Sequence, residues 1–379
     1  MLTFTFPVGY HDLHKVKIID FQLNRWYSLG YARLEDMSEA GSRIQSLDDW
    51  KPEMVRQAEK AMSEGRVLNG TFYYRAAEFF THPKDPDKQS LYDRFIDLFY
   101  GQIVAGENIT RHLVPYEGGF LPALVVTPRT LDEKGVIVVH GGFDSLIEEF
   151  YSMACYFAEA GYRVVMFEGP GQGGALRRYG LALTHEWEKV AKAVLDYFAL
   201  DDVTWLGISM GGWMCFRAAA FEPRIKRVVA SSIAYDYMQM LSRPLQFITR
   251  SLFRLPRLLN YLGKEKMKRM PQENWGGLNL MFITRIDDPV EASRVVLEFN
   301  ERNLHSELVT QDVLILTGAE DHFIPLKMHK KQVAALTAAR SITERIFTRA
   351  EQGQNHCQIG NFGLALRTVV EWLAHLQDV

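Results

Sequence analysis

From about residue 109 to the C-terminus, short apolar runs alternate with longer segments of helical periodicity, and this alternation limits the fold more than any other feature. The predicted strands are Val136–His140, Arg163–Glu168, Val203–Gly207, Arg227–Ser231, Val313–Thr317 and Thr343–Phe347. Helices are predicted between them at about 145–160, 184–199, 210–220, 326–339 and 361–377. Strands that are apolar throughout and are joined by helices are typical of a mostly parallel sheet covered by helices on both faces. The sequence therefore predicts an α/β fold.

The pattern of apolar residues divides the chain into three regions. Residues 109–232 and 309–379 carry the alternating pattern, which opens with two extended runs around Glu117-Gly118-Gly119, a hairpin signal. Residues 233–308 separate two neighbouring strands of the sheet and are too long for a loop. They are predicted to form a mostly helical insertion outside the sheet, which we interpret as a lid. Residues 1–108 predict a helical N-terminal domain.

Within the N-terminal region, three helices are expected. Apolar residues recur at helical spacing behind Pro52, a residue suited to a first helical turn. The dipeptide Asn69-Gly70 is expected to end this helix. Two further helical runs follow, at Thr71–Phe80 and Ser90–Tyr100.

Composition and charge exclude several classes of protein. Of the 379 residues, 47% are hydrophobic, which is too many for a disordered chain. The net charge of −3 leaves no excess of positive charge to neutralise phosphates, so a nucleic-acid partner is not expected. Met1–Tyr10 lacks the basic and apolar regions of a signal peptide, and no long apolar run predicts a membrane span. A cytoplasmic enzyme is expected.

The sharpest chemical signal is the run Gly207-Ile208-Ser209-Met210-Gly211, followed by Gly212. It comes directly after an apolar strand and directly before a helical segment, which is the context of a nucleophile elbow. In such a turn the serine stands on a strained strand-to-helix connection, and glycines let the backbone fold tightly around it. Ser209 is therefore the predicted nucleophile. The amide of Met210, close to the helix N-terminus, is positioned to stabilise an oxyanion.

A serine hydroxyl needs a base, and the base needs an acid to orient it. In this type of fold the chain order is serine, acid, histidine. Asp321 lies in the loop that leaves the strand Val313–Thr317, so it is the predicted acid. Glu320 beside it and Asp288 in the insertion remain as alternatives.

Four histidines follow the predicted acid, and their surroundings separate them. His322 adjoins Asp321, whereas His329 and His375 fall on predicted helices. Only His356 occupies a loop between a late strand and the last helix, where an imidazole can reach the serine. His356 is therefore the predicted base.

A second source of oxyanion donors is expected after the first parallel strand. The turn His140-Gly141-Gly142-Phe143 is rich in glycine and exposes backbone N–H groups. We assign the amides of Gly142 and Phe143, with Phe143 preferred. His140 precedes the serine in the chain and is interpreted as a structural support of the loop.

Two competing motifs suggest a different chemistry. The run Gly169-Pro170-Gly171-Gln172-Gly173-Gly174 matches a dinucleotide-binding fingerprint, but Pro170 removes an amide that would bind pyrophosphate. We interpret it as a tight turn at the rim of the site. The pair His11 and His14 lies in an undefined terminal segment, and the cysteines at 155, 215 and 357 are isolated. No metal site, disulfide framework or bound cofactor is predicted.

These residues together resemble the α/β-hydrolase superfamily, and in particular its branch with a helical N-terminal domain. That branch includes fermentation–respiration-switch-type esterases, dihydroxypseudooxynicotine hydrolase and fungal polyketide-shortening pigment hydrolases. The resemblance is carried by Gly141-Gly142-Phe143-Asp144-Ser145 with Glu148-Glu149, Glu168 to Gly173, Gly207 to Gly212, Asn355-His356-Cys357 and the helix Phe72 to Glu78. It implies an α/β-hydrolase fold with a helical N-terminal domain and a helical lid. Members of the branch include esterases and hydrolases that cleave a carbon–carbon bond next to a ketone.

The sequence thus predicts a serine hydrolase that acts on a small molecule without a cofactor. The residues do not identify the scissile bond, so an ester and a ketone-activated carbon–carbon bond both stay open. Whether the chain forms a homodimer stays open as well. The rivals are a noncatalytic binding protein on the same fold and a nicotinamide enzyme that uses the glycine turn. For carbon–carbon cleavage, Asp236 is the candidate for an additional acid, with a helix N-cap as its alternative role.

The insertion carries a basic amphipathic stretch between residues 243 and 270. Its apolar side chains alternate with arginines and lysines against a single acidic residue, Glu265. Three interpretations stay open: an apolar stripe packed on the body, a helix that docks on a membrane surface or a partner, and a roof over a large pocket. The roof would favour bulky aromatic or polyketide-like substrates, with an arginine meeting an anionic or phenolic group.

Overall fold

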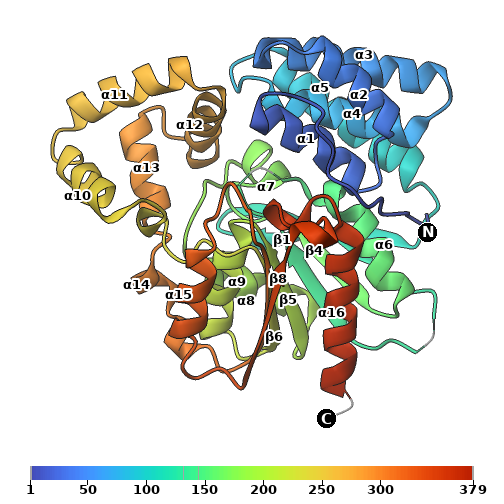
Figure 1. Ribbon diagram of the computed structural model, residues 1–379. Helices are drawn as coiled ribbons and strands as arrows, with labels where there is room; N and C mark the ends of the chain where they lie inside the picture. The colour runs from blue at the N-terminus through green and yellow to red at the C-terminus, as the bar shows by residue number, and fades with distance from the viewer. Residues whose placement is uncertain (1, 131, 144, 378–379) are drawn as a thin grey trace.

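The structure is a computed structural model that describes residues 2–377 except 131 and 144 (Figure 1). Eight strands form one sheet in the order β1-β2-β4-β3-β5-β6-β7-β8. Their bounds are β1 Ile109–Tyr116, β2 Gly119–Val126, β3 Val136–His140, β4 Arg163–Phe167, β5 Val203–Ile208, β6 Ile225–Ser231, β7 Asp312–Gly318 and β8 Ser341–Phe347. The first two strands are antiparallel to their neighbours, and β3 to β8 are parallel. The predicted α/β fold and hairpin are confirmed.

Helices cover both faces of the sheet because successive strand residues point to opposite faces. In β3 and β5, Val139 and Leu206 belong to the core on one face, whereas Val138 and Trp205 belong to the core on the other. The helices that follow the strands are α6 Tyr151–Glu159, α7 Gly173–Arg177, α8 Trp187–Phe198, α9 Gly211–Phe221, α15 Lys327–Ala335 and α16 Phe362–Gln377. The segment predicted as one helix at about 145–160 begins instead as a 3₁₀ turn, Ile147–Phe150.

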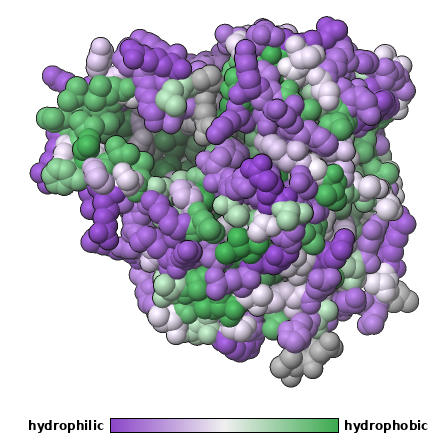
Figure 2. All heavy atoms as spheres, viewed as in Figure 1, coloured by the Kyte–Doolittle hydropathy of each residue, from purple (hydrophilic) through white to green (hydrophobic). Residues whose placement is uncertain are grey.

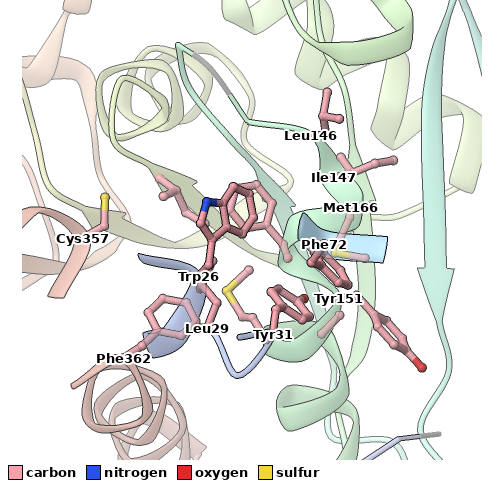
Figure 3. Packing of buried hydrophobic residues seen from close by; sticks show 14 of the residues in the cluster. Trp26, Leu29, Tyr31, Phe72, Leu146, Ile147, Tyr151, Met166, Cys357 and Phe362 are labelled. Carbon is pink, nitrogen blue, oxygen red and sulfur yellow. The ribbon is translucent and has the colours of Figure 1, made fainter. Parts of the chain in front are cut away.

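The N-terminal region forms five helices that sit over one end of the sheet (Figure 1). They are α1 Lys17–Ser28, α2 Leu34–Arg43, α3 Trp50–Ser63, α4 Val67–Phe80 and α5 Asp87–Leu98. Residues 2–16 are not helical, although the pattern of the whole region predicted helix. The helices have no separate core: Trp26, Tyr31 and Phe72 pack in one cluster with Ile147 and Met166 of the sheet layer (Figure 3).

The predicted break at Asn69-Gly70 is wrong, because both residues lie inside α4. A Cβ on Gly70 would stand 2.6 Å from the Met62 sulfur and 3.1 Å from the Ala58 carbonyl oxygen of α3. This glycine therefore allows two helices to approach closely rather than ending one. The helix end lies at Gly65, whose φ of +74° suits glycine.

Residues 233–308 leave the sheet after β6 and return at β7, as predicted. They form α10 Arg243–Leu252, α11 Pro256–Arg269, α12 Pro271–Thr284, α13 Pro289–Leu297 and α14 Glu301–Leu304. α10 to α13 stand on the side of the N-terminal helices, above the same end of the sheet, and α14 lies beside α15 (Figure 1). Within the described residues, no helix is long and apolar enough to cross a membrane.

Candidate active site

Ser209 stands on the turn between β5 and α9 with a φ of +62°, a conformation that side chains rarely adopt. Glycines surround it because nothing larger fits. A Cβ on Gly207 would lie 2.0 Å from the Gly211 carbonyl oxygen, and one on Gly211 would lie 2.6 Å from that of Gly141. A Cβ on Gly212 would lie 2.0 Å from the carbonyl oxygen of Ser232. The spacing of the motif thus follows from close backbone packing on three sides of the serine.

The structure brings Ser209, His356 and Asp321 into one hydrogen-bonded row. The His356 Nε2 atom lies 2.9 Å from the Ser209 Oγ atom. The His356 Nδ1 atom lies 2.7 Å from the Asp321 Oδ2 atom. His356 is 147 residues from Ser209 and 35 residues from Asp321 in the chain. Ser209 and Asp321 lie just beyond the carboxyl ends of β5 and β7, and His356 lies in the connection from β8 to α16.

The Asp321 carboxylate is fully buried and accepts several hydrogen bonds. The backbone N–H groups of Phe323 and Ile324 each donate to its Oδ1 atom at 2.9 Å, and the Ser232 hydroxyl donates to Oδ2 at 3.1 Å. Burial alone would raise the pKa of Asp321, but the charge of His356 and these donors hold it below its ordinary value. Burial alone would lower the pKa of His356, but the Asp321 carboxylate raises it well above its ordinary value.

The two alternative acids lie elsewhere. Glu320 is exposed and pairs with Arg349, with 3.0 Å between the Arg349 Nε and Glu320 Oε1 atoms. Asp288 caps α13 by accepting hydrogen bonds from the N–H groups of Val290 and Glu291. The geometry therefore favours Asp321 over both.

The other candidate histidines make no hydrogen bond to Ser209 within the described residues. His329 is buried between Thr317 and Glu344, and His375 is exposed on α16. His140 lies behind the site against Trp187, and burial lowers its pKa to about 4. His322 lines the same cavity as Ser209, and burial together with the charge of His356 lowers its pKa to about 4.

The turn after β3 lies against the serine turn. A Cβ on Gly142 would stand 2.7 Å from the Met210 backbone nitrogen, so the two segments touch. The Gly142 N–H donates to the Ser145 hydroxyl at 3.3 Å, so this amide is already bonded within the protein. Phe143 and Met210 both line the cavity that holds the Ser209 side chain.

Gln172 holds this turn in place, a role that the sequence analysis did not assign. Its Nε2 atom donates to the carbonyl oxygens of Gly141 and Gly142 at 2.9 and 3.1 Å, and its Oε1 atom accepts from the Gly169 N–H. The Gly174 N–H donates to Glu168 at 2.6 Å. Because these amides of the 169–174 turn are bonded within the protein, the turn supports the site rather than presenting amides to a pyrophosphate.

A family model described as the alpha/beta hydrolase family matches residues 136–356, which is more than half of the chain. The chain belongs to this α/β-hydrolase family. Its curated relatives are hydrolases, and the chain is accordingly a hydrolase. It is 29% identical to Hydrolase acrC of Aspergillus aculeatus over 72% of this chain and 70% of the relative. It is 28% identical to 20-hydroxy-prefusarin hydrolase FUS2 of Gibberella moniliformis over 79% of this chain and 78% of the relative.

Two solved structures share the fold over nearly the whole length of this hydrolase. The 2,6-dihydroxy-pseudo-oxynicotine hydrolase has a TM-score of 0.64 at 20% identity, with 92% of this chain and 94% of that chain covered. A structure named AbyA5 has a TM-score of 0.67 at 17% identity, with 93% and 94% covered.

The cavity of the hydrolase above Ser209 has a volume of about 460 Å³, a size typical of sites for small organic molecules. Its walls come from three parts of the chain. α1 contributes Phe21 and Arg25, the insertion contributes Met240 and Trp275, and the body contributes the serine turn with Phe362. Most of these side chains are apolar.

A buried ion network ties the N-terminal helices to the loop that leaves the glycine turn. Arg25 and Arg75 both pair with Glu149, with 2.6 Å between the Arg75 Nε and Glu149 Oε1 atoms. The same Glu149 oxygen accepts the N–H of Leu146 at 3.2 Å. Arg75 also pairs with Glu78, which is buried as well. The only arginine among the described lining residues is Arg25, and it comes from α1 rather than from the basic stretch.

The insertion reaches the cavity through α12 and the segment before α10, not through the basic stretch. Trp275 stacks on Phe79 of α4 with 5.0 Å between ring centroids, and the Asn279 side chain donates to the Phe143 carbonyl oxygen at 3.0 Å. The interpretation of α10 and α11 as the roof is therefore wrong. A packed apolar stripe is wrong too, because every residue of α10 and α11 keeps exposed surface.

The structure does not bring Asp236 to the cavity. Its carboxylate accepts hydrogen bonds from the Gln239 N–H at 2.9 Å and the Glu301 N–H at 3.3 Å. These bonds match the alternative role of a helix cap. His14, from the terminal histidine pair, bonds instead to the backbone of Val16 and Ile44.

Proposed function

We propose that this hydrolase cleaves its substrate through a Ser209–His356–Asp321 triad and an acyl-enzyme intermediate. The observation that carries the proposal is the row of two short hydrogen bonds that ends on a serine of strained backbone inside an apolar cavity. A serine, a base in contact with it and a carboxylate that orients the base are the three parts that acyl transfer requires.

In the proposed mechanism, Ser209 attacks the substrate carbonyl while His356 Nε2 takes the hydroxyl proton. The buried Asp321 carboxylate orients the imidazole and stabilises its charged form, which agrees with the raised pKa of His356. The backbone N–H groups of Met210 and Phe143 stabilise the oxyanion, with Gly142 shaping the turn. His356 then gives the proton to the leaving group, and water, activated by the same histidine, releases the acid.

The substrate proposed is a bulky, mainly apolar small molecule of aromatic or polyketide-like character. The cavity volume exceeds what a short acetyl ester fills, and Phe21, Trp275 and Phe362 line it. A relative of this chain carries the name of one such small-molecule hydrolase, 20-hydroxy-prefusarin hydrolase FUS2.

The scissile bond proposed first is an ester, because its alkoxide leaving group needs only the proton that His356 carries. A carbon–carbon bond next to a ketone is the second candidate, since the same attack on a carbonyl would begin that reaction. Asp236 does not supply the additional acid for it, because this carboxylate caps a turn away from the lining residues.

Rates of the variants Ser209→Ala, His356→Ala and Asp321→Asn on a bulky aromatic ester test the proposal. We expect each to lower kcat by about four orders of magnitude, and double variants to be scarcely slower, because the three groups act as a unit. Glu320→Gln and His375→Ala serve as controls with near-normal rates. Near-normal turnover by Asp321→Asn, together with loss in Glu320→Gln, would overturn the choice of acid.

A further inference from the structure

Two helices of the insertion expose an apolar surface that none of the described residues covers. We call residues 241–270, which contain α10 and α11, the arm. Phe247 is 74% exposed and Tyr261 is 63% exposed. Figure 2 shows hydrophobic side chains gathered at the upper left, where α10 and α11 lie in the same view of Figure 1. The other large exposed apolar residues of the arm are Leu241, Leu245, Ile248, Leu255, Leu258, Leu262 and Met270.

The spacing of these residues shows that the exposure is an organised stripe. Leu245 and Ile248 are three residues apart, which places them on one side of α10, and Leu241 comes just before this helix. Leu258, Tyr261 and Leu262 share one side of α11 by the same rule, and Leu255 comes just before it. An amphipathic helix of a globular protein normally turns such a stripe to its core. Here the apolar stripe faces away from the body.

The opposite side of the arm is the one in contact with the protein. Asn260 donates to Asp288 at 2.7 Å, and Arg294 of α13 donates to the Phe253 carbonyl oxygen at 3.2 Å. Leu259, Gly263 and Met267 are half-buried on this side. α11 is therefore half-buried on one side, while Leu258, Tyr261 and Leu262 on another side stay exposed.

The arm is also strongly basic. It holds eight arginines and lysines against Glu265, a net charge of +7 in a chain of net charge −3. Arg250, Arg254 and Arg257 are exposed, and within the described part of the chain none of them pairs with a carboxylate. Exposed apolar side chains and unpaired positive charges thus occur together on one segment.

We propose that the arm docks on the surface of a bilayer that contains anionic phospholipids. Helices with large aliphatic and aromatic residues interspersed with arginine and lysine lie in the membrane interface, where both kinds of side chain are satisfied. A nucleic acid would pair with the arginines but leave the leucines in water. The charge of the arm therefore favours an anionic lipid surface, which accepts both.

Docking would bring the cavity to the place where apolar substrates collect. The arm leads directly into α12, whose Trp275 lines the cavity, and Met240 precedes the arm and lines it too. This consequence rests on the proposed function, whereas the docking itself does not. A loss of membrane binding and a loss of hydrolysis are therefore separate results.

The test is flotation of the full chain with vesicles of phosphatidylcholine alone and of phosphatidylcholine mixed with phosphatidylglycerol. We expect binding only to the mixed vesicles and release at high salt, because screening weakens surface charge interactions. Arg250→Gln/Arg254→Gln/Arg257→Gln should lower the partition coefficient about a hundredfold, at about fivefold for each charge. Lys226→Gln/Lys330→Gln/Lys331→Gln is a charge-matched control away from the arm, and should bind as the unchanged protein does.

A second pair of variants tests the contribution of the exposed apolar side chains of the arm to membrane docking. Phe247→Ser and Leu258→Ser should each lower the partition coefficient by about tenfold, and Val8→Ser, at another exposed apolar position, should not. Hydrolysis of a water-soluble ester by all these variants shows that they are folded. No flotation of the unchanged protein, an equal loss in the lysine control, a dimer broken by Phe247→Ser, or equal binding to duplex DNA would each overturn the proposal.

Discussion

The N-terminal helices and the insertion both contribute side chains to the cavity above Ser209, but they are held to the body in different ways. Trp26 and Phe72 of the N-terminal helices are fully buried in the core of the sheet layer, and Arg75 is buried with its carboxylate partners. The insertion meets the cavity through α12 and Met240, while its arm remains exposed.

This difference separates two tasks. The N-terminal helices hold the loop that follows the turn after β3, because Glu149 pairs with Arg25 and Arg75 and also accepts the N–H of Leu146. In the insertion, Trp275 and Met240 line the cavity, and Asn279 donates a hydrogen bond to the Phe143 carbonyl oxygen. We therefore expect the N-terminal helices to fix the shape of the cavity, and the insertion, which has fewer contacts with the body, to determine substrate specificity.

The largest expected effect concerns matched arginines in the two regions. Arg75→Met removes a buried partner of Glu149 and should lower the free energy of unfolding by about 3–5 kcal/mol, because a buried carboxylate loses its compensating charge. Arg254→Met in the arm should change it by less than about 0.5 kcal/mol. Urea unfolding followed by circular dichroism measures both. Equal changes in the free energy of unfolding for the two variants would contradict the difference between the two regions.

The next effect concerns Gln172 and Asn279, the two side chains that bond to the turn after β3. Gln172→Ala removes two buried hydrogen bonds to the carbonyl oxygens of Gly141 and Gly142, and we expect kcat to fall by about tenfold to a hundredfold. Asn279→Ala removes one bond to Phe143 from a less buried position and should cost about threefold. Steady-state kinetics that determine kcat and KM separately measure both changes. A larger loss in Asn279→Ala would reverse the assigned roles.

A smaller effect should appear in substrate choice. Trp275→Ala opens the roof and should raise KM about tenfold for a bulky aromatic ester, with little change for a small activated ester. The exposed Leu258 of the arm gives the control, since Leu258→Ala should leave both KM values unchanged. If Trp275→Ala affected both esters equally, α12 would not act as a specificity wall.

A further effect is a pH dependence of stability under the N-terminal helices. Burial, together with the charge of Glu148, raises the pKa of Glu168 to about 8 from its ordinary 4.5. The folded state then keeps a proton that the unfolded state loses, so this contribution to stability is full below about pH 4.5 and is lost as pH rises to about 8. Glu168→Gln should flatten the profile of unfolding free energy against pH, whereas Glu273→Gln in the insertion should leave it unchanged. A profile that stays steep in Glu168→Gln would contradict this assignment.

The body of the fold could be predicted from the sequence because its signals are local. Each parallel strand is a short apolar run, and the serine turn is marked by glycines that close packing requires at 207, 211 and 212. The order of serine, acid and histidine then singled out Asp321 and His356, which the structure places in contact.

The parts that sequence reasoning missed depend on packing between distant segments. A glycine such as Gly70 is typical of a helix end, but here it lies inside a helix, where it lets Met62 of the adjacent helix pack closely. An amphipathic pattern shows that the arm has an apolar side, but not whether that side faces the body. Trp275 and Asn279 carry no motif, while Gln172 lies within the quoted glycine turn and Ser232 directly follows β6, so position after a strand was the signal for those two.

The most direct test of the account is covalent labelling by a fluorophosphonate that carries a bulky aromatic group, followed by peptide mapping. We predict one adduct on Ser209, no adduct in Ser209→Ala, and labelling slowed by orders of magnitude in His356→Ala, because the serine depends on this base. An adduct on another residue, or labelling of His356→Ala at the rate of the unchanged protein, would contradict the central claim that Ser209 is an activated nucleophile in this cavity.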